Sequence, residues 1–81
     1  MKDSIYSTVL KFAILMLREL RANDDKGDWE AWKPDAVELI AEIEHHKNRL
    51  HLALCQGDVA LVAEHSADLA NICMKAHEVF T

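Results

Sequence analysis

The sequence predicts an all-α protein of three helices. No segment shows the sustained alternation of apolar and polar residues that is typical of a half-buried strand. The two glycines and the single proline, Gly27, Pro34 and Gly57, fall at three places and divide the rest of the chain into three helical segments. Since the chain has 81 residues, we expect one small domain over residues 1–81.

The first helix is expected from about residue 4 to residue 22, with Asp3 or Ser4 as its cap. Its apolar residues cover more than one stripe of the helix: Ile5, Val9, Phe12, Ile14, Met16, Leu17 and Leu20. Such a helix is usually buried against several neighbours. Because a chain this short builds only a modest core, we expect another subunit to supply some of those neighbours.

A connector over residues 23–33, dense in turn-forming and charged residues, precedes the second helix. That helix is expected to start near Pro34 and to end at Gly57, which suits the left-handed position after a helix. Asp58 then caps the third helix, which is expected to run to about Val79. The apolar faces of these two helices predict a core of Val37, Ile40, Ile43, Leu50, Leu54, Leu61, Val62, Leu69, Ile72, Cys73 and Ala76.

The very short connection at Gly57 makes the second and third helices an antiparallel hairpin. Residues at equal distances from the turn then face one another, so His46 lies level with Asp68. By the same count Arg49 lies level with His65. Spacings of three place each helix's two residues on one side of that helix. We therefore expect these four polar groups to converge on one spot.

The composition excludes several classes of partner. The net charge of −5 disfavours nucleic-acid binding, which needs a positive surface. No apolar run approaches the roughly 18 residues of a membrane span, and the start of the chain lacks a signal-peptide pattern. Cys55 and Cys73 lie in apolar helical settings and are expected to be buried free thiols, which suits a reducing compartment. We expect a cytoplasmic protein with neither nucleic acid nor membrane as partner.

Three segments carry a family resemblance. They are Arg-Ala-Asn-Asp-Asp-Lys-Gly-Asp-Trp at residues 21–29, Ala-Leu-Cys-Gln-Gly-Asp at residues 53–58 and Ala-Asp-Leu-Ala-Asn-Ile at residues 67–72. With these motifs, nearly the whole chain resembles the small MazG-like nucleotide pyrophosphohydrolases of the all-α NTP pyrophosphatase superfamily, which are common in phages and mobile elements. The resemblance implies a four-helix-bundle dimer or dimer of dimers. It also implies Mg²⁺-dependent cleavage of nucleoside triphosphates to the monophosphate and pyrophosphate.

The chain departs from this family at the metal-binding motifs. Family members carry Glu-Glu-x-x-Glu on the second helix and Glu-x-x-Asp on the third. Anchored on the hairpin turn, those five positions fall on His45, His46, Arg49, His65 and Asp68. Mg²⁺ needs oxygen ligands and negative charge, and an arginine in the site would repel it. The sequence therefore predicts that Mg²⁺ binding is lost.

The favoured interpretation is a MazG-like nucleotide-binding protein whose hydrolytic activity is lost or altered and which needs no cofactor. Arginine presents a fork of donors suited to phosphate, and a bound phosphate favours protonated imidazole. Lys26 is placed to reach a phosphate, and Trp29 and Trp32 to stack on a base. The candidate nucleotide-binding residues are Arg49, His46, His45, His65, Lys26, Trp29 and Asn71.

Two alternatives stay open. In the first, the chain is an active pyrophosphohydrolase in which His46, His65 and Asp68 bind Zn²⁺, Mn²⁺ or Ni²⁺, with Glu42 and Glu64 one turn away. In the second, the chain is a catalytically dead module that binds a protein partner. There, an ion pair between Arg49 and Asp68 satisfies both charges, and the histidines fill a half-polar core.

Overall fold

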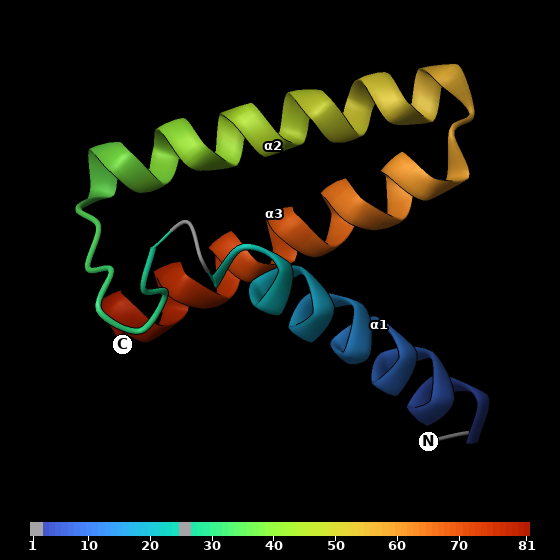
Figure 1. Cartoon of the computed structure of the whole chain (residues 1–81), viewed down its shortest axis with the longest axis horizontal. Coiled ribbons are helices and arrows are strands. Elements are labelled where there is room, and N and C mark those ends of the chain that lie inside the picture. The colour runs from blue at the N-terminus through green and yellow to red at the C-terminus, as the bar shows by residue number, and fades with distance from the viewer. Residues whose placement is uncertain (1–2, 25–26) are drawn as a thin grey trace.

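The protein is built of three α-helices, as the computed structural model in Figure 1 shows for residues 3–24 and 27–81. Helix α1 spans Asp3–Ala22, α2 spans Ala36–Gln56 and α3 spans Val59–Phe80. Helices α2 and α3 form an antiparallel hairpin, and α1 packs against α3. The predicted all-α fold is confirmed, since these residues contain no strand. No helix among them is both long enough and apolar enough to cross a membrane.

Local hydrogen bonds fix the ends of the hairpin helices. Asp35 caps α2 by accepting a hydrogen bond from the Glu38 amide at 2.9 Å. The helix therefore begins at Ala36, two residues after Pro34, near which it was expected to start. Gly57 adopts the left-handed conformation with φ of 67°, and Asp58 caps α3. Because only these two residues separate the helices, α3 must turn back along α2.

The core of a single chain is small. Its fully buried apolar residues are Leu39, Ala53, Ala67 and Ile72, each at most 5% exposed. The predicted apolar face is wrong in part, because Val37, Ile40, Leu54 and Cys73 are exposed. Ala53 of α2 and Ala67 of α3 are among these buried residues, whereas other apolar residues of both helices face solvent. Cys55 is also exposed, so the expectation of two buried thiols is wrong.

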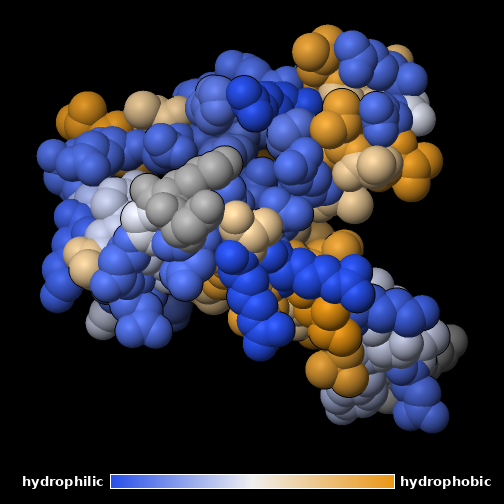
Figure 2. Space-filling view, viewed as in Figure 1, coloured by the Kyte–Doolittle hydropathy of each residue, from blue (hydrophilic) through white to orange (hydrophobic). Residues whose placement is uncertain are grey.

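Helix α1 leaves most of its apolar surface uncovered. None of its residues is buried, although burial against several neighbours was expected. Its amino-terminal half projects away from the hairpin (Figure 1). Figure 2 shows apolar side chains along this projecting arm and at the closed end of the hairpin. Among the helices that the structure describes, α3 is the one that α1 contacts.

Two polar side chains of α3 hold the other segments in place. Lys75 is 1% exposed, and its Nζ donates a hydrogen bond of 2.8 Å to the Trp29 carbonyl. The same ammonium lies 5.0 Å from the centre of the Trp29 ring. Asn71 donates from Nδ2 to the Met16 carbonyl at 3.0 Å, which fastens α1 to α3. These contacts position the connector and the carboxyl-terminal end of α1 beside α3.

Replacing Lys75 with methionine is expected to lower the free energy of unfolding by about 1–3 kcal/mol, because the part-buried Trp29 carbonyl loses its donor. Urea denaturation followed by tryptophan fluorescence measures this loss. Lys47→Met is the matched control, since Lys47 pairs with Glu44 on an exposed surface and its loss is expected to cost less than about 0.5 kcal/mol. Equal effects of the two substitutions would contradict a structural role for Lys75.

Candidate functional site

An open cleft of about 950 Å³ lies where the end of α1 and the connector meet the hairpin. Its walls carry seven carboxylic side chains: Glu19, Asp24, Asp28, Glu38, Glu42, Glu64 and Asp68. Among the described residues that line it, Arg49 is the one permanent cation. The cleft therefore attracts cations and repels a phosphate chain that arrives without them.

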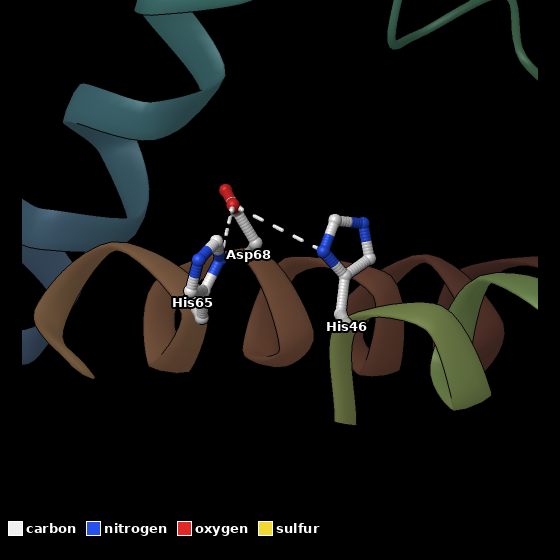
Figure 3. Close-up of side chains that lie close together, drawn as sticks. All are labelled: His46, His65 and Asp68. Carbon is white, nitrogen blue, oxygen red and sulfur yellow. Dashed lines mark ion pairs between the residues drawn. The ribbon is translucent and has the colours of Figure 1, made fainter. Parts of the chain in front are cut away.

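Two imidazoles and one carboxylate meet inside this cleft. His46 reaches in from α2, whereas His65 and Asp68 lie one turn apart on α3 (Figure 3). Asp68 Oδ2 is 4.0 Å from His46 Nδ1 and 3.8 Å from His65 Nδ1. The two distances exceed those of hydrogen bonds, so the three groups converge without satisfying one another. The level placement of His46 and Asp68 across the hairpin is confirmed.

The Nδ1 atoms of both histidines are buried and have no hydrogen-bond partner. His65 is only 8% exposed, so water satisfies its ring poorly. Nε2 of His46 lies 3.4 Å from a Glu42 carboxylate oxygen. A metal-bound histidine usually turns its second ring nitrogen toward a carboxylate in this way, which frees the first nitrogen as a ligand. The surroundings of His46 thus match those of a metal ligand.

The spacing of these atoms suits a transition-metal ion. One ligand atom from each of His46, His65 and Asp68 lies within 4.8 Å of the others. Ligands about 2.1 Å from a tetrahedral ion are about 3.4 Å apart, so a small inward movement would complete the set. Two imidazole nitrogens with a carboxylate oxygen fit Zn²⁺, Mn²⁺ or Ni²⁺ better than Mg²⁺.

A second group of acids adjoins the histidines and includes a residue that the sequence analysis missed. Carboxylate oxygens of Glu19, Glu64 and Asp68 also lie within 4.8 Å of one another. Glu19 comes from α1, whereas the family motifs lie on the hairpin helices. The only signal in the sequence was a carboxylate near the end of the first helix, between Arg18 and Arg21. Nothing in the sequence says which face of α1 meets α3.

The pKa of Glu19 is raised above its ordinary value. Burial is the main cause, and repulsion from Asp68 and Glu64 adds to it. A hydrogen bond with Asp68 also favours the protonated form, while His65 acts in the opposite direction. At a pH where Glu19, Glu64 and Asp68 are all ionised, they repel one another in the cleft.

Arg49 does not form the ion pair with Asp68 that the protein-interaction alternative predicted. The described side chains contain no ion pair between Arg49 and Asp68, which faces the two histidines instead. Arg49 is exposed on the wall of the cleft. His45 is exposed as well, but it does not line the cleft; its ring packs edge-on at 5.1 Å from the ring of His46. Of these two candidate phosphate ligands, the fold places only Arg49 in the cleft.

The remaining candidate residues lie near the connector. Trp29 and Trp32 both line the cleft, with ring centres 5.5 Å apart and planes tilted by 55°. Asn71 lines it too, and its buried Oδ1 has no hydrogen-bond partner. Lys26 lies outside the described residues.

No known protein family, curated protein or solved structure matches the chain. The similarity to MazG-like pyrophosphohydrolases therefore stays a prediction. The functional argument depends on the geometry and charge of the cleft itself.

Glu19→Gln is expected to raise the melting temperature of the metal-free protein at pH 7 by a few degrees. The folded-state pKa of Glu19 lies above the ordinary glutamate value of 4.5, so its stabilising contribution is full below that pH. That contribution is lost as the pH rises through the folded-state pKa, where ionised Glu19 meets Asp68 and Glu64. The gain from glutamine should consequently vanish near pH 4.

Thermal unfolding in a chelating buffer across pH 4–8 measures this dependence. Glu44→Gln removes the same charge from an exposed ion pair outside the cleft and is expected to change stability little at any pH. A gain in the Glu19 variant that did not depend on pH would contradict the crowding of carboxylates.

Proposed function

We propose that this protein is a divalent-metal-dependent hydrolase of nucleoside triphosphates, a MazG-like pyrophosphohydrolase with a divergent metal site. In it, His46, His65 and Asp68 hold a transition-metal ion such as Mn²⁺, Zn²⁺ or Ni²⁺. The observation that carries the proposal is the pair of buried, unpartnered Nδ1 atoms that face one Asp68 carboxylate. Buried polar atoms without partners are rare, and a bound ion would satisfy both.

The charge of the cleft favours this function over metal-free nucleotide binding. A triphosphate brings several negative charges into a cleft that already carries seven acids and one arginine. Arg49 alone cannot offset that repulsion, whereas a divalent ion neutralises both sides. The acidity that Glu19 and Glu64 add thus supports a cation in the complex.

Each part of the cleft has a role in this proposal. A bound metal ion polarises a phosphoryl oxygen and makes water a better nucleophile. Arg49 offers its fork of donors to phosphate oxygens, and Trp29 and Trp32 present aromatic rings to a base. Together they would bind a nucleoside triphosphate and release the monophosphate and pyrophosphate.

The second candidate function is nucleotide binding without metal or hydrolysis. The exposed position of Arg49 on the cleft wall, away from any ion pair with Asp68, favours it. In that case the protein would sequester or sense a nucleotide through Arg49, His46 and His65.

Pyrophosphate release from a panel of nucleoside triphosphates, after chelation and reloading with one metal at a time, tests the proposal. We expect activity with Mn²⁺ or another transition metal, and a loss of roughly 10–100-fold or more in kcat/KM in His65→Ala and in His46→Ala. His51→Ala is the matched control, because His51 lies exposed on the same helix as His46 and outside the cleft.

Three outcomes separate the candidates. Activity that depends on the metal and on both histidines supports the hydrolase. If a nucleotide bound in the presence of chelator and no metal gave turnover, the hydrolase would be refuted and metal-free nucleotide binding would be supported. If neither binding nor turnover were found, both candidates would be refuted, and the protein-interaction module would be the interpretation left to test.

We also propose that the protein is a homo-oligomer, a four-helix-bundle dimer or a dimer of dimers. The exposed apolar face of α1 supports it: Tyr6, Leu10, Ile14 and Leu17 recur at helical spacing and are each 47–63% exposed. An exposed apolar stripe of this kind would promote aggregation of a monomer, so we expect a second copy of the chain to bury it.

Leu10→Asp is expected to shift the protein toward the monomer, because it places a charge in that apolar contact. Size-exclusion chromatography with light scattering measures the mass. Thr8→Asp is the control, since Thr8 lies exposed on the opposite side of α1. A monomeric wild type would refute self-association through this face.

A further inference from the structure

The aromatic side of the cleft is carried by a short turn of the connector, residues 28–32, which contains both tryptophans of the chain. Hydrogen bonds within the turn close it: the Trp32 amide donates to the Asp28 carbonyl at 3.1 Å and to the Trp29 carbonyl at 3.3 Å. The Asp28 side chain accepts from two further amides of the same turn. These bonds fix the backbone of the turn locally. Its position on the hairpin and the orientation of its indole rings depend on contacts from outside the turn.

Lys75 supplies such a contact from α3, beside whose carboxyl-terminal end the connector passes (Figure 1). Its side chain is buried, and Nζ donates a hydrogen bond of 2.8 Å to the Trp29 carbonyl. The same ammonium lies 5.0 Å from the centre of the Trp29 ring, so one charge holds both the backbone and the ring of this residue. Among the hydrogen bonds of the described residues, this is the one that joins residues 28–32 to a helix.

Packing alone does not require a charge at this position of α3. Burial of an ammonium costs free energy unless its donors find partners. The partners of Lys75 are the carbonyl and the ring of Trp29 and, at 3.7 Å, a carboxylate oxygen of the exposed Glu78. Lys75 is not among the described residues that line the cleft. Any influence of Lys75 on a ligand there must therefore pass through Trp29 and, across the ring contact of 5.5 Å, through Trp32.

We propose that Lys75 is a positioning residue: it sets the affinity of the cleft for the base of a nucleotide by holding Trp29 and Trp32 in place as an aromatic wall. The inference rests on the proposed function only in that the cleft must bind a nucleotide, and it does not require hydrolysis.

The two ends of the ligand depend on different parts of the fold. Arg49 and the histidines, which would hold the phosphate chain and its metal ion, lie on the hairpin helices. The aromatic wall lies on the connector and depends on Lys75. Loss of Lys75 should consequently weaken recognition of the base and leave recognition of the phosphate chain unchanged.

Inorganic triphosphate has a phosphate chain and no base, so its binding compared with that of nucleotides separates the two ends. Calorimetry with Mn²⁺ would use this ion and the α,β-methylene analogues of ATP, GTP, CTP and UTP, which resist cleavage between the α and β phosphates. In Lys75→Met, we expect Kd for the tightest-binding analogue to rise about 5–50-fold, which is the range that stacking of a base on an aromatic side chain contributes. Kd for triphosphate should stay within about twofold of the wild-type value.

Circular dichroism tests the position of the rings independently of any ligand. Two indole rings this close couple their electronic transitions and give paired bands of opposite sign. Because the chain has two tryptophans, these bands report on Trp29 and Trp32 alone. They should weaken in Lys75→Met and disappear in Trp32→Phe. Lys75→Met should also cost less nucleotide affinity in the Trp32→Phe background than in the wild type, since residues that act through one another are not additive.

Glu78→Gln is the matched control, because it removes the other partner of the Lys75 ammonium and leaves Trp29 in place. We expect it to change neither the bands nor either Kd. Since Lys75→Met lowers stability, binding is measured at a temperature below its unfolding transition. Lys75→Gln, which keeps a donor without the charge, is the second variant and should shift the same quantities in the same direction by a smaller amount.

The proposal is overturned if either the paired bands or the affinity for the nucleotide analogue is unchanged in both Lys75 variants. It is also overturned if the analogue and triphosphate lose affinity equally, because Lys75 would then act on the fold as a whole. Failure of the proposed hydrolase would show in the wild type, as binding without turnover, and would leave these comparisons intact. A wild type that bound no nucleotide would overturn the inference together with both candidate functions.

Discussion

The two-residue turn between α2 and α3 is the constraint on which the rest of the molecule depends. Gly57 takes the left-handed conformation and Asp58 caps the next helix, so the chain reverses its direction within these two residues. This reversal fixes the register of the hairpin and thereby sets His46 opposite Asp68. A longer connection would let the helices slide past one another, and the imidazoles would no longer meet the carboxylate.

Asp68 is the residue in which the functional arguments meet. It faces both imidazoles, contacts Glu19 of α1 and lies one turn from Glu64. One carboxylate cannot form hydrogen bonds with so many neighbours. The Nδ1 atoms of His46 and His65 are therefore left without hydrogen-bond partners. A cation between the two imidazoles and the carboxylate would relieve this shortage of partners. The cleft is lined by seven carboxylic side chains, so it is acidic although histidine or arginine stands at four of the five positions where the resemblance expects acids.

The sequence was sufficient to predict the all-α fold and the part of the site that the hairpin helices form. The turn at Gly57 and the period of the helix predict that His46, His65 and Asp68 converge, because both signals are local. The place of Glu19 in the cleft could not be predicted, since the docking of α1 on α3 depends on long-range packing that spacing in the sequence does not show. The ion pair of Arg49 and Asp68, which one alternative interpretation predicted, is absent among the described side chains, because spacing in the sequence brings two residues near the same level of the hairpin but does not set the direction of a side chain. Cys73 shows the same limit, because an apolar stripe can also face outward in a chain whose core is small.

Anomalous diffraction from crystals grown with Mn²⁺ would test the central claim most directly. The account predicts an anomalous peak bounded by the Nδ1 atoms of His46 and His65 and by the Asp68 carboxylate. Such a peak would place an ion where the buried nitrogens lack partners. The absence of any peak there, together with an Arg49 side chain turned inward to pair with Asp68, would contradict it.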